Sequence, residues 1–150
     1  EVMDSLRSQV ASLRWDYRDA SIALDGPEAA TVRALPEIRF ALREVLENAI
    51  VHGDPEQPAV GVEVGRRPGT GNGDTVRVEV RDDGPGIPRE EVDVLTGGSE
   101  TPLLHSSGIG LWVVKWIVEE SGGEVAYRRD DGGSIVTITL PADSESAPSV

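Results

Sequence analysis

The sequence lacks several residues on which whole classes of function depend. It has no cysteine among its 150 residues, which excludes disulfide bonds, thiolate metal sites and a catalytic thiol. Its only histidines, His52 and His105, lie far apart in the sequence and form no HExxH pattern, so we do not expect a zinc site. No apolar run approaches the roughly 20 residues that a membrane-spanning helix needs. Carboxylates by themselves could still hold magnesium.

Basic residues are also scarce. The chain carries 14 Lys and Arg against 27 Asp and Glu, with Lys115 as its only lysine and a formal net charge of -13. This charge argues against binding to nucleic acid or to an anionic membrane surface. Two explanations for the missing lysines stay open: a halophilic protein, in which high salt screens self-repulsion, or a GC-rich genome. The start, Glu1-Val2-Met3-Asp4, is no signal peptide, so we expect a cytoplasmic domain excised from a longer protein.

Hydrophobic periodicity predicts the fold class. Some segments have apolar residues at helical spacing, and other segments have valines at every second position, as in strands. Together they predict an α+β fold, a two-layer α/β sandwich whose mixed, mostly antiparallel sheet has helices on one face. The expected helices span residues 2–18, 37–52 and 109–121, the expected strands span 21–24, 31–35, 60–64, 76–80, 124–128 and 134–140, and residues 142–150 are expected to be a disordered tail.

The second predicted helix carries a polar stripe. Glu44, Asn48 and His52 follow one another at intervals of four residues and so share one helix face. The Asn48 amide can give Mg²⁺ an oxygen ligand without added charge, and the Glu44 carboxylate can orient or deprotonate a nucleophile. On this helix alone, however, an ordinary solvated face is the stronger explanation.

Two glycine-bearing segments follow this helix. Asp82-Asp83-Gly84-Pro85-Gly86-Ile87 comes straight after a predicted strand. Its glycines permit positive φ and the close approach of a ligand, and a carboxylate there can accept a hydrogen bond from an adenine amine, although a polar turn explains the segment equally well. Ser107-Gly108-Ile109-Gly110-Leu111 opens a predicted helix, and the free N–H groups of a helix start form an anion site.

Other nucleotide-binding patterns do not fit. Val113 occupies the position of the third glycine of a dinucleotide fingerprint, and no Gly-Lys-Ser/Thr sequence provides a P-loop. The glycine-rich segment 69–73 joins two predicted strands, which favours a hairpin connection. We expect Trp112 and Trp116 to pack in the core or against a lid rather than to stack on a base.

In this order and spacing, the three segments resemble the nucleotide site of GHKL-type ATPases, and most closely the ATP-binding domain of histidine kinases. The acidic composition and the sequence Leu111-Trp112-Val113-Val114 are similar to those of haloarchaeal sensor kinases. The resemblance implies a Bergerat ATP-binding fold over residues 19–141, ATP and Mg²⁺ as cofactors, and an ATP lid over residues 88–107. Many glycines and few apolar residues between Ser99 and Ser107 predict that this part of the lid is disordered without nucleotide. The resemblance implies that Asn48 is the magnesium ligand, that Glu44 assists phosphoryl transfer and that Asp82 recognises adenine. The other nucleotide-binding residues that it implies are His52, Gly84, Gly86, Ile87, Ser107, Gly108, Ile109, Gly110 and Leu111.

The chain departs from the family pattern at four places. Asp83 replaces an asparagine, Ser106 replaces a glycine, and Val51 stands where many of these kinases have a basic residue. The lid segment also has no phenylalanine, since Phe40 is the only one in the chain. The missing lid aromatic and the missing basic residue at Val51 bear on the catalytic rate more than on ATP binding.

The resemblance also implies partners. The phosphoacceptor histidine is expected on an upstream dimerisation domain of the same parent protein, with residues 1–18 as the linker helix from it and a response regulator as an indirect partner. Alone, the domain is expected to bind ATP as a monomer and to transfer little phosphate, because the acceptor that must be positioned is missing. Two alternatives stay open: a serine kinase of the anti-sigma-factor type with the same fold, and a degenerate module that binds nucleotide or a partner without catalysis.

Overall fold

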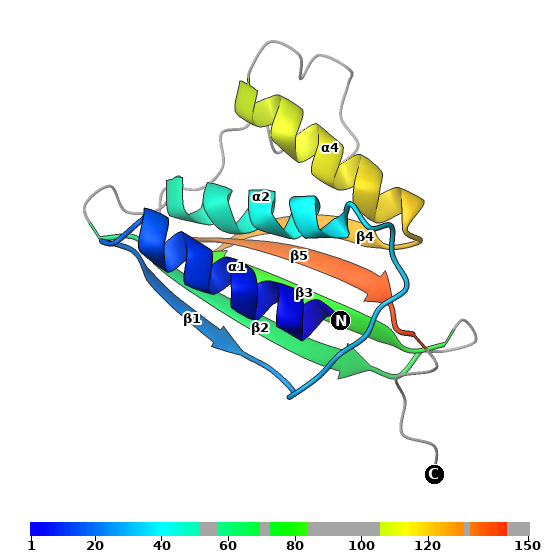
Figure 1. The fold of residues 1–150 in the computed structure, drawn as a ribbon. Helices are drawn as coiled ribbons and strands as arrows, with labels where there is room; N and C mark the ends of the chain where they lie inside the picture. Colours follow the sequence, from blue (N-terminus) through cyan, green and yellow to red (C-terminus); the bar gives the residue numbers. More distant parts are fainter. Residues whose placement is uncertain (52–56, 70–72, 84–105, 131–132, 144–150) are drawn as a thin grey trace.

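Five strands pair into one mixed sheet, and helices cover one of its faces (Figure 1). The computed structural model describes residues 1–51, 57–69, 73–83, 106–130 and 133–143. The expected two-layer α+β architecture is thereby confirmed. The elements are the helices α1 (Val2–Asp16), α2 (Ile38–Val51) and α4 (Ser106–Glu120) and the strands β1 (Ser21–Asp25), β2 (Ala59–Arg67), β3 (Thr75–Asp82), β4 (Glu124–Asp130) and β5 (Gly133–Pro141).

The strand order β1-β2-β3-β5-β4 places β3 at the centre of the sheet. Strand β1 runs parallel to β2, and every other pair is antiparallel. The valines of β2 and β3 pair in register, with Val62 opposite Val80. Because β5 lies between β3 and β4, the last residue of β3, Asp82, lies opposite Ser134 of β5.

The period of two along β3 decides which side chains face the helices. Val76, Val78 and Val80 are buried, and Asp82 occupies the next position of the same phase. The carboxylate of Asp82 therefore points toward the helical layer and not toward the open face of the sheet. This places a buried acid at the end of a central strand.

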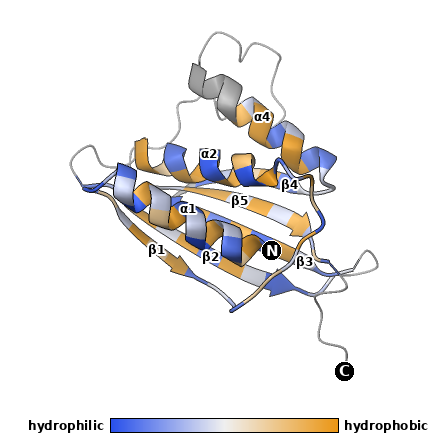
Figure 2. Cartoon of the chain, viewed as in Figure 1, coloured by the Kyte–Doolittle hydropathy of each residue, from blue (hydrophilic) through white to orange (hydrophobic). Residues whose placement is uncertain are grey.

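The helices bury one apolar stripe each, and Figure 2 shows apolar and hydrophilic residues alternating along α1 and α2. Leu6 and Leu13 of α1 are fully buried in the same core cluster as Leu42 of α2 and Leu111 of α4. The helix α1 thus packs within the domain core, while a further role as a linker from an upstream region stays a prediction. In the part of the chain that the structure describes, no helix is long and apolar enough to span a membrane.

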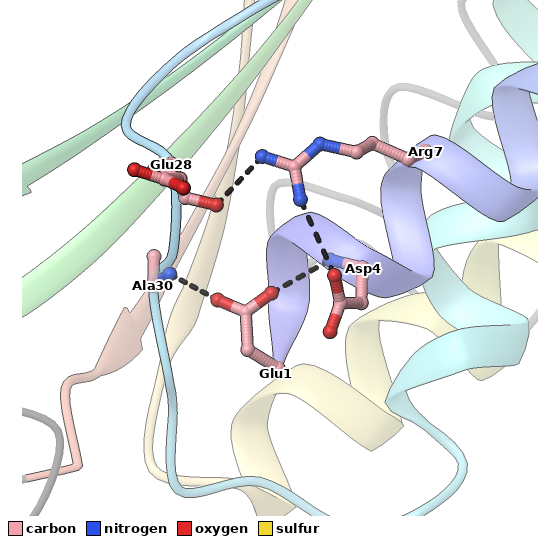
Figure 3. A network of polar contacts seen from close by, with 5 residues as sticks. All are labelled: Glu1, Asp4, Arg7, Glu28 and Ala30. Carbon is pink, nitrogen blue, oxygen red and sulfur yellow. Dashed lines mark hydrogen bonds and ion pairs between the residues drawn. The ribbon is translucent and has the colours of Figure 1, made fainter.

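A polar network fastens the start of α1 to the segment that follows β1 (Figure 3). The Glu1 carboxylate accepts a hydrogen bond from the Asp4 backbone N–H at 2.7 Å and another from the Ala30 backbone N–H. Arg7 pairs with Asp4 at 3.2 Å and donates to the Glu28 carbonyl at 2.6 Å. The first residue therefore acts as an N-cap and as a cross-link at the same time.

Four details differ from the expectations. The piece at 31–35 forms a single bridge, Val32 to Ala142, and Asp143 donates its N–H to the Thr31 carbonyl, so the first two residues of the expected tail are ordered. The helix α4 begins at Ser106, three residues earlier than expected. Trp112 and Trp116 are about half exposed, so their expected place in the core is wrong.

Candidate functional site

The end of β3 holds the most constrained polar group of the candidate site. Asp82 is 5% exposed, and the fully buried Ser134 donates its hydroxyl to Asp82 Oδ2 at 2.6 Å. An ionised carboxylate is tolerated in such a place only where donors satisfy it. The Ser134 hydroxyl therefore helps to hold the Asp82 carboxylate in one orientation on the helical side of the sheet.

Gly133 allows β5 to approach β3 this closely. A β-carbon on Gly133 would lie 1.8 Å from the Asp82 carbonyl oxygen, and the residue has a φ of +147°. Only glycine fits both the contact and the backbone conformation. Ser134 and Gly133 were not among the predicted site residues. The sequence could have indicated Ser134, because it lies on the same face of the predicted strand as the buried Val136 and Ile138, where an apolar side chain is expected.

Glu44 lies half-buried on α2 in a setting that disfavours its charge. Burial raises the pKa of the Glu44 carboxyl, the negative charge of Glu47 one turn away raises it further, and Arg43 opposes the rise. Glu47 itself accepts a 2.7 Å hydrogen bond from the Tyr17 hydroxyl, and this bond is the main reason that the pKa of Tyr17 is raised. Glu44 consequently keeps its proton to higher pH than a free glutamate, which suits a group that exchanges protons.

Asn48 lies one turn beyond Glu44 on α2. Its side chain is half-buried, and its Nδ2 is buried without a hydrogen-bond partner among the described residues. A buried amide NH₂ without an acceptor favours a ligand that supplies an acceptor oxygen, whereas only the amide oxygen could ligate a metal ion. The described residues contain no group of three or more His, Cys, Asp or Glu that could hold a metal ion. A magnesium ion here would therefore need ligand oxygens besides Asn48, as is common for Mg²⁺ bound with phosphates.

The start of α4 supplies the third part of the site. Ser107, Gly108, Ile109 and Gly110 lie in its first turns, so the second glycine segment is part of the helix and not a loop before it. The side chain of Leu111 is fully buried in the core, so Leu111 could contact a ligand only through its backbone. Figure 1 shows that α2 and β3 end, and α4 begins, at the same end of the molecule. The predicted residues His52, Gly84, Gly86 and Ile87, and the expected lid at 88–107 except its last two residues, lie outside the described residues.

Comparisons with known proteins agree with this arrangement. The family described as "Histidine kinase-, DNA gyrase B-, and HSP90-like ATPase" matches residues 35–144. The chain is 33% identical over 144 residues to the methanogenesis regulatory histidine kinase FilI of Methanothrix harundinacea, covering 93% of this chain and 16% of FilI. It is 34% identical over 125 residues to the sensor histidine kinase component HK1 of Mycobacterium tuberculosis, covering 74% of this chain and 70% of HK1.

A solved structure shares the fold. The catalytic domain of histidine kinase ThkA in a nucleotide-free form superposes with a TM-score of 0.74 at 21% identity, over 93% of this chain and 92% of ThkA's. The family match covers more than half of the 150 residues and includes α2, β3, α4 and β5, which carry the polar groups described above. The chain therefore belongs to the family of histidine kinase-, DNA gyrase B- and HSP90-like ATPases.

Proposed function

We propose that this chain is the ATP-binding catalytic domain of a sensor histidine kinase, which transfers the γ-phosphate of ATP to a histidine on a separate dimerisation domain of its parent protein. The buried Asp82–Ser134 pair carries the proposal, since a carboxylate fixed at 2.6 Å by a serine can recognise a hydrogen-bond donor by position. The adenine amine of ATP is such a donor. The similarity to FilI and HK1 favours a histidine kinase over other members of the family.

The triphosphate would lie near the start of α4. The free N–H groups of this helix start can bind phosphate oxygens, which matters in a chain of charge -13 that otherwise repels polyphosphate. Asn48 would hold Mg²⁺ together with phosphate oxygens, and the ion would offset the phosphate charge when bound. Glu44 would orient or take the proton of the attacking group, in keeping with its raised pKa.

The acceptor and the downstream partner belong to the parent protein. The chain spans 16% of the length of FilI, so most of such a protein lies beyond this domain. We place the acceptor histidine on a dimerisation domain and a response regulator after it. We further infer a cytoplasmic location for this domain, while the single lysine and the net charge of -13 fit a high-salt origin and a GC-rich genome equally well.

The adenine assignment is tested by thermal unfolding against increasing Mg-ATP. Specific binding raises the melting temperature as ln(1 + [ATP]/Kd). We expect the shift in the wild type, its loss in Asp82→Asn, and its retention in the matched variant Asp83→Asn, which removes an exposed neighbouring carboxylate. A shift that survives in Asp82→Asn would contradict the assigned role, and no shift in the folded wild type would favour a degenerate module.

The transfer reaction is tested with radiolabelled ATP and the parent protein. A phosphohistidine is labile in acid and stable in base, whereas a phosphoserine is stable in acid. We expect acid-labile label that disappears in Glu44→Gln while Mg-ATP binding is retained. Acid-stable label on a separate protein would instead identify a serine kinase of the anti-sigma-factor type.

A further inference from the structure

The face of the sheet opposite the helices holds a cavity of about 360 Å³. Its residues are out of phase with the buried Val78 and Ile138, so the cavity and the Asp82–Ser134 pair lie on opposite faces of the sheet. No proposed nucleotide contact reaches this face. The residues that line the cavity are Arg67, Thr75, Arg77, Glu124, Ala126, Arg128, Thr137 and Thr139.

The cavity concentrates positive charge in an acidic chain. Three arginines and one glutamate line it, which leaves a local excess of two positive charges in a protein of net charge -13. Arg67 and Arg128 make no ion pair within the part of the chain that the structure describes. The cavity therefore has cationic groups that the described structure does not neutralise.

Arg77 is one of the residues that line this cavity, and its guanidinium is only partly satisfied. Its guanidinium reaches Glu79 at only 3.4 Å, and Glu79 is shared with Arg81 at 3.3 Å. Its Nε is buried without an acceptor among the described residues. The Arg77 side chain as a whole is 30% exposed, so an anion in the cavity can contact this guanidinium, which the described residues satisfy only in part.

The register brings two of the arginines together. Arg67 lies opposite Thr75, and Arg77 is two residues further along β3. Diagonal neighbours of this kind have β-carbons about 7–8 Å apart, so two arginine side chains can reach one anion. The hydroxyl groups of Thr75 and Thr139 lie in the same cavity, and Thr139 is opposite Arg77. The site thus offers guanidinium and hydroxyl donors from three adjacent strands.

We propose that this cavity binds a phosphate dianion, either free phosphate or the phosphate group of a small monoester, independently of the nucleotide site. Arg67 and Arg128 have no ion-pair partner among the described residues, and the planar guanidinium fork suits phosphate oxygens. The cavity is within the range of about 300–1,000 Å³ that is common for small-molecule sites. A polyanion such as nucleic acid would extend beyond the cavity and meet the repulsion of the surrounding acidic chain, which favours a small ligand.

The test is an NMR titration of the folded chain, with the backbone amide resonances assigned, by sodium phosphate and by glycerol phosphate at constant ionic strength. We expect saturable shifts of β3, β4 and β5 amides near Arg77, Arg128 and Thr139, which persist when Mg-ATP saturates the nucleotide site. The affinity for phosphate should fall tenfold or more in Arg67→Gln and in Arg77→Gln. Arg39→Gln, an exposed arginine on α2 outside this cavity, is the matched control and should bind as the wild type does.

Several outcomes would overturn the proposal. Unsaturable shifts, or equal weakening in Arg39→Gln, would indicate general charge effects. Displacement of phosphate by Mg-ATP would place the anion in the nucleotide site. Equal binding of succinate would show that the cavity does not select phosphate.

A preference for glycerol phosphate over inorganic phosphate would support a monoester as the source, and the reverse preference would support the free ion. All these results are independent of whether the domain transfers phosphate.

Discussion

At the scale of single residues, two carboxyl groups of the candidate site differ in their surroundings. Asp82 is buried at the end of β3 and accepts a hydrogen bond from Ser134. Glu44 is half-buried on α2, where burial raises the pKa of its carboxyl, Glu47 raises it further and Arg43 lowers it. A carboxylate fixed by a buried donor suits recognition of a partner, whereas a carboxyl group whose proton affinity is raised suits proton exchange.

Ser134→Ala should lower both stability and nucleotide affinity. The substitution leaves Asp82 buried with one donor fewer, and a lost hydrogen bond to a charged group costs about 1.5–3 kcal/mol. Urea unfolding and calorimetric titration with Mg-ATP would measure the two effects. Thr137→Val, which removes a hydroxyl from the open face of the same strand, should change nucleotide affinity little. Equal ATP affinity in Ser134→Ala and the wild type would remove Ser134 from the site.

Glu44→Gln should change stability in a pH-dependent way. Because the folded protein raises the pKa of Glu44 above its ordinary value of 4.5, the folded state binds this proton more tightly than the unfolded state. The wild type keeps this contribution below about pH 4.5 and loses it as pH rises through the folded pKa. The melting temperature of Glu44→Gln should therefore rise relative to the wild type from acid to neutral pH. A difference that stays constant across this range would show that Glu44 titrates normally.

At the scale of elements, the contact between β3 and β5 depends on a glycine. Gly133→Ala would place a β-carbon 1.8 Å from the Asp82 carbonyl oxygen, so the two strands must separate where Asp82 and Ser134 meet. We expect a loss of at least about 3 kcal/mol, as for severe core overpacking, together with loss of the Mg-ATP thermal shift. Gly61→Ala on β2 is the matched control, because nothing lies within 4 Å of its added β-carbon, and it should be neutral or slightly stabilising. Comparable melting temperatures for the two variants would contradict the close contact.

Local patterns predicted most elements but not their long-range neighbours. The valines of β2 and β3 and the apolar stripe of α2 were sufficient to predict these elements within a few residues. The role of Ser134 was missed because its partner Asp82 is 52 residues away and no local spacing encodes their pairing. For the tryptophans of α4, the expected place in the core is wrong, and packing against the lid stays a prediction. The buried stripe of this helix is Leu111, Val114, Ile117 and Val118.

Other candidate residues remain predictions for a different reason. The glycines of the first segment act through backbone conformation and ligand approach, which sequence spacing alone does not define. Gly84 and Gly86 fall outside the described residues, as does His52. Their assignment rests on the family resemblance, and the site residues that the structure does describe are Glu44, Asn48, Asp82 and Leu111 with their side chains and residues 107–110 with their backbone.

At the scale of the whole molecule, the shared core predicts one cooperative transition that includes α1. Trp15 lies on α1, whereas Trp112 and Trp116 lie on α4, so single-tryptophan variants can follow the two helices separately. Since Leu6, Leu42 and Leu111 belong to one core cluster, the fluorescence transitions in urea should coincide. Tryptophan-to-phenylalanine changes at these exposed positions should cost little stability. An earlier transition at Trp15 would show that α1 behaves as an appended linker helix.

The strand order has a consequence for the order in which the protein matures. Asp82 ends β3, but its partner Ser134 belongs to the strand that completes the sheet, and the helix α4 lies between them in the sequence. During synthesis the ribosome must therefore add 52 further residues after Asp82 before its serine exists. Contacts of such long sequence separation form slowly and late. A nascent chain would acquire the buried Asp82–Ser134 pair only after β5 has left the ribosome. With the role proposed for Asp82, nucleotide capture would then report that the sheet is complete.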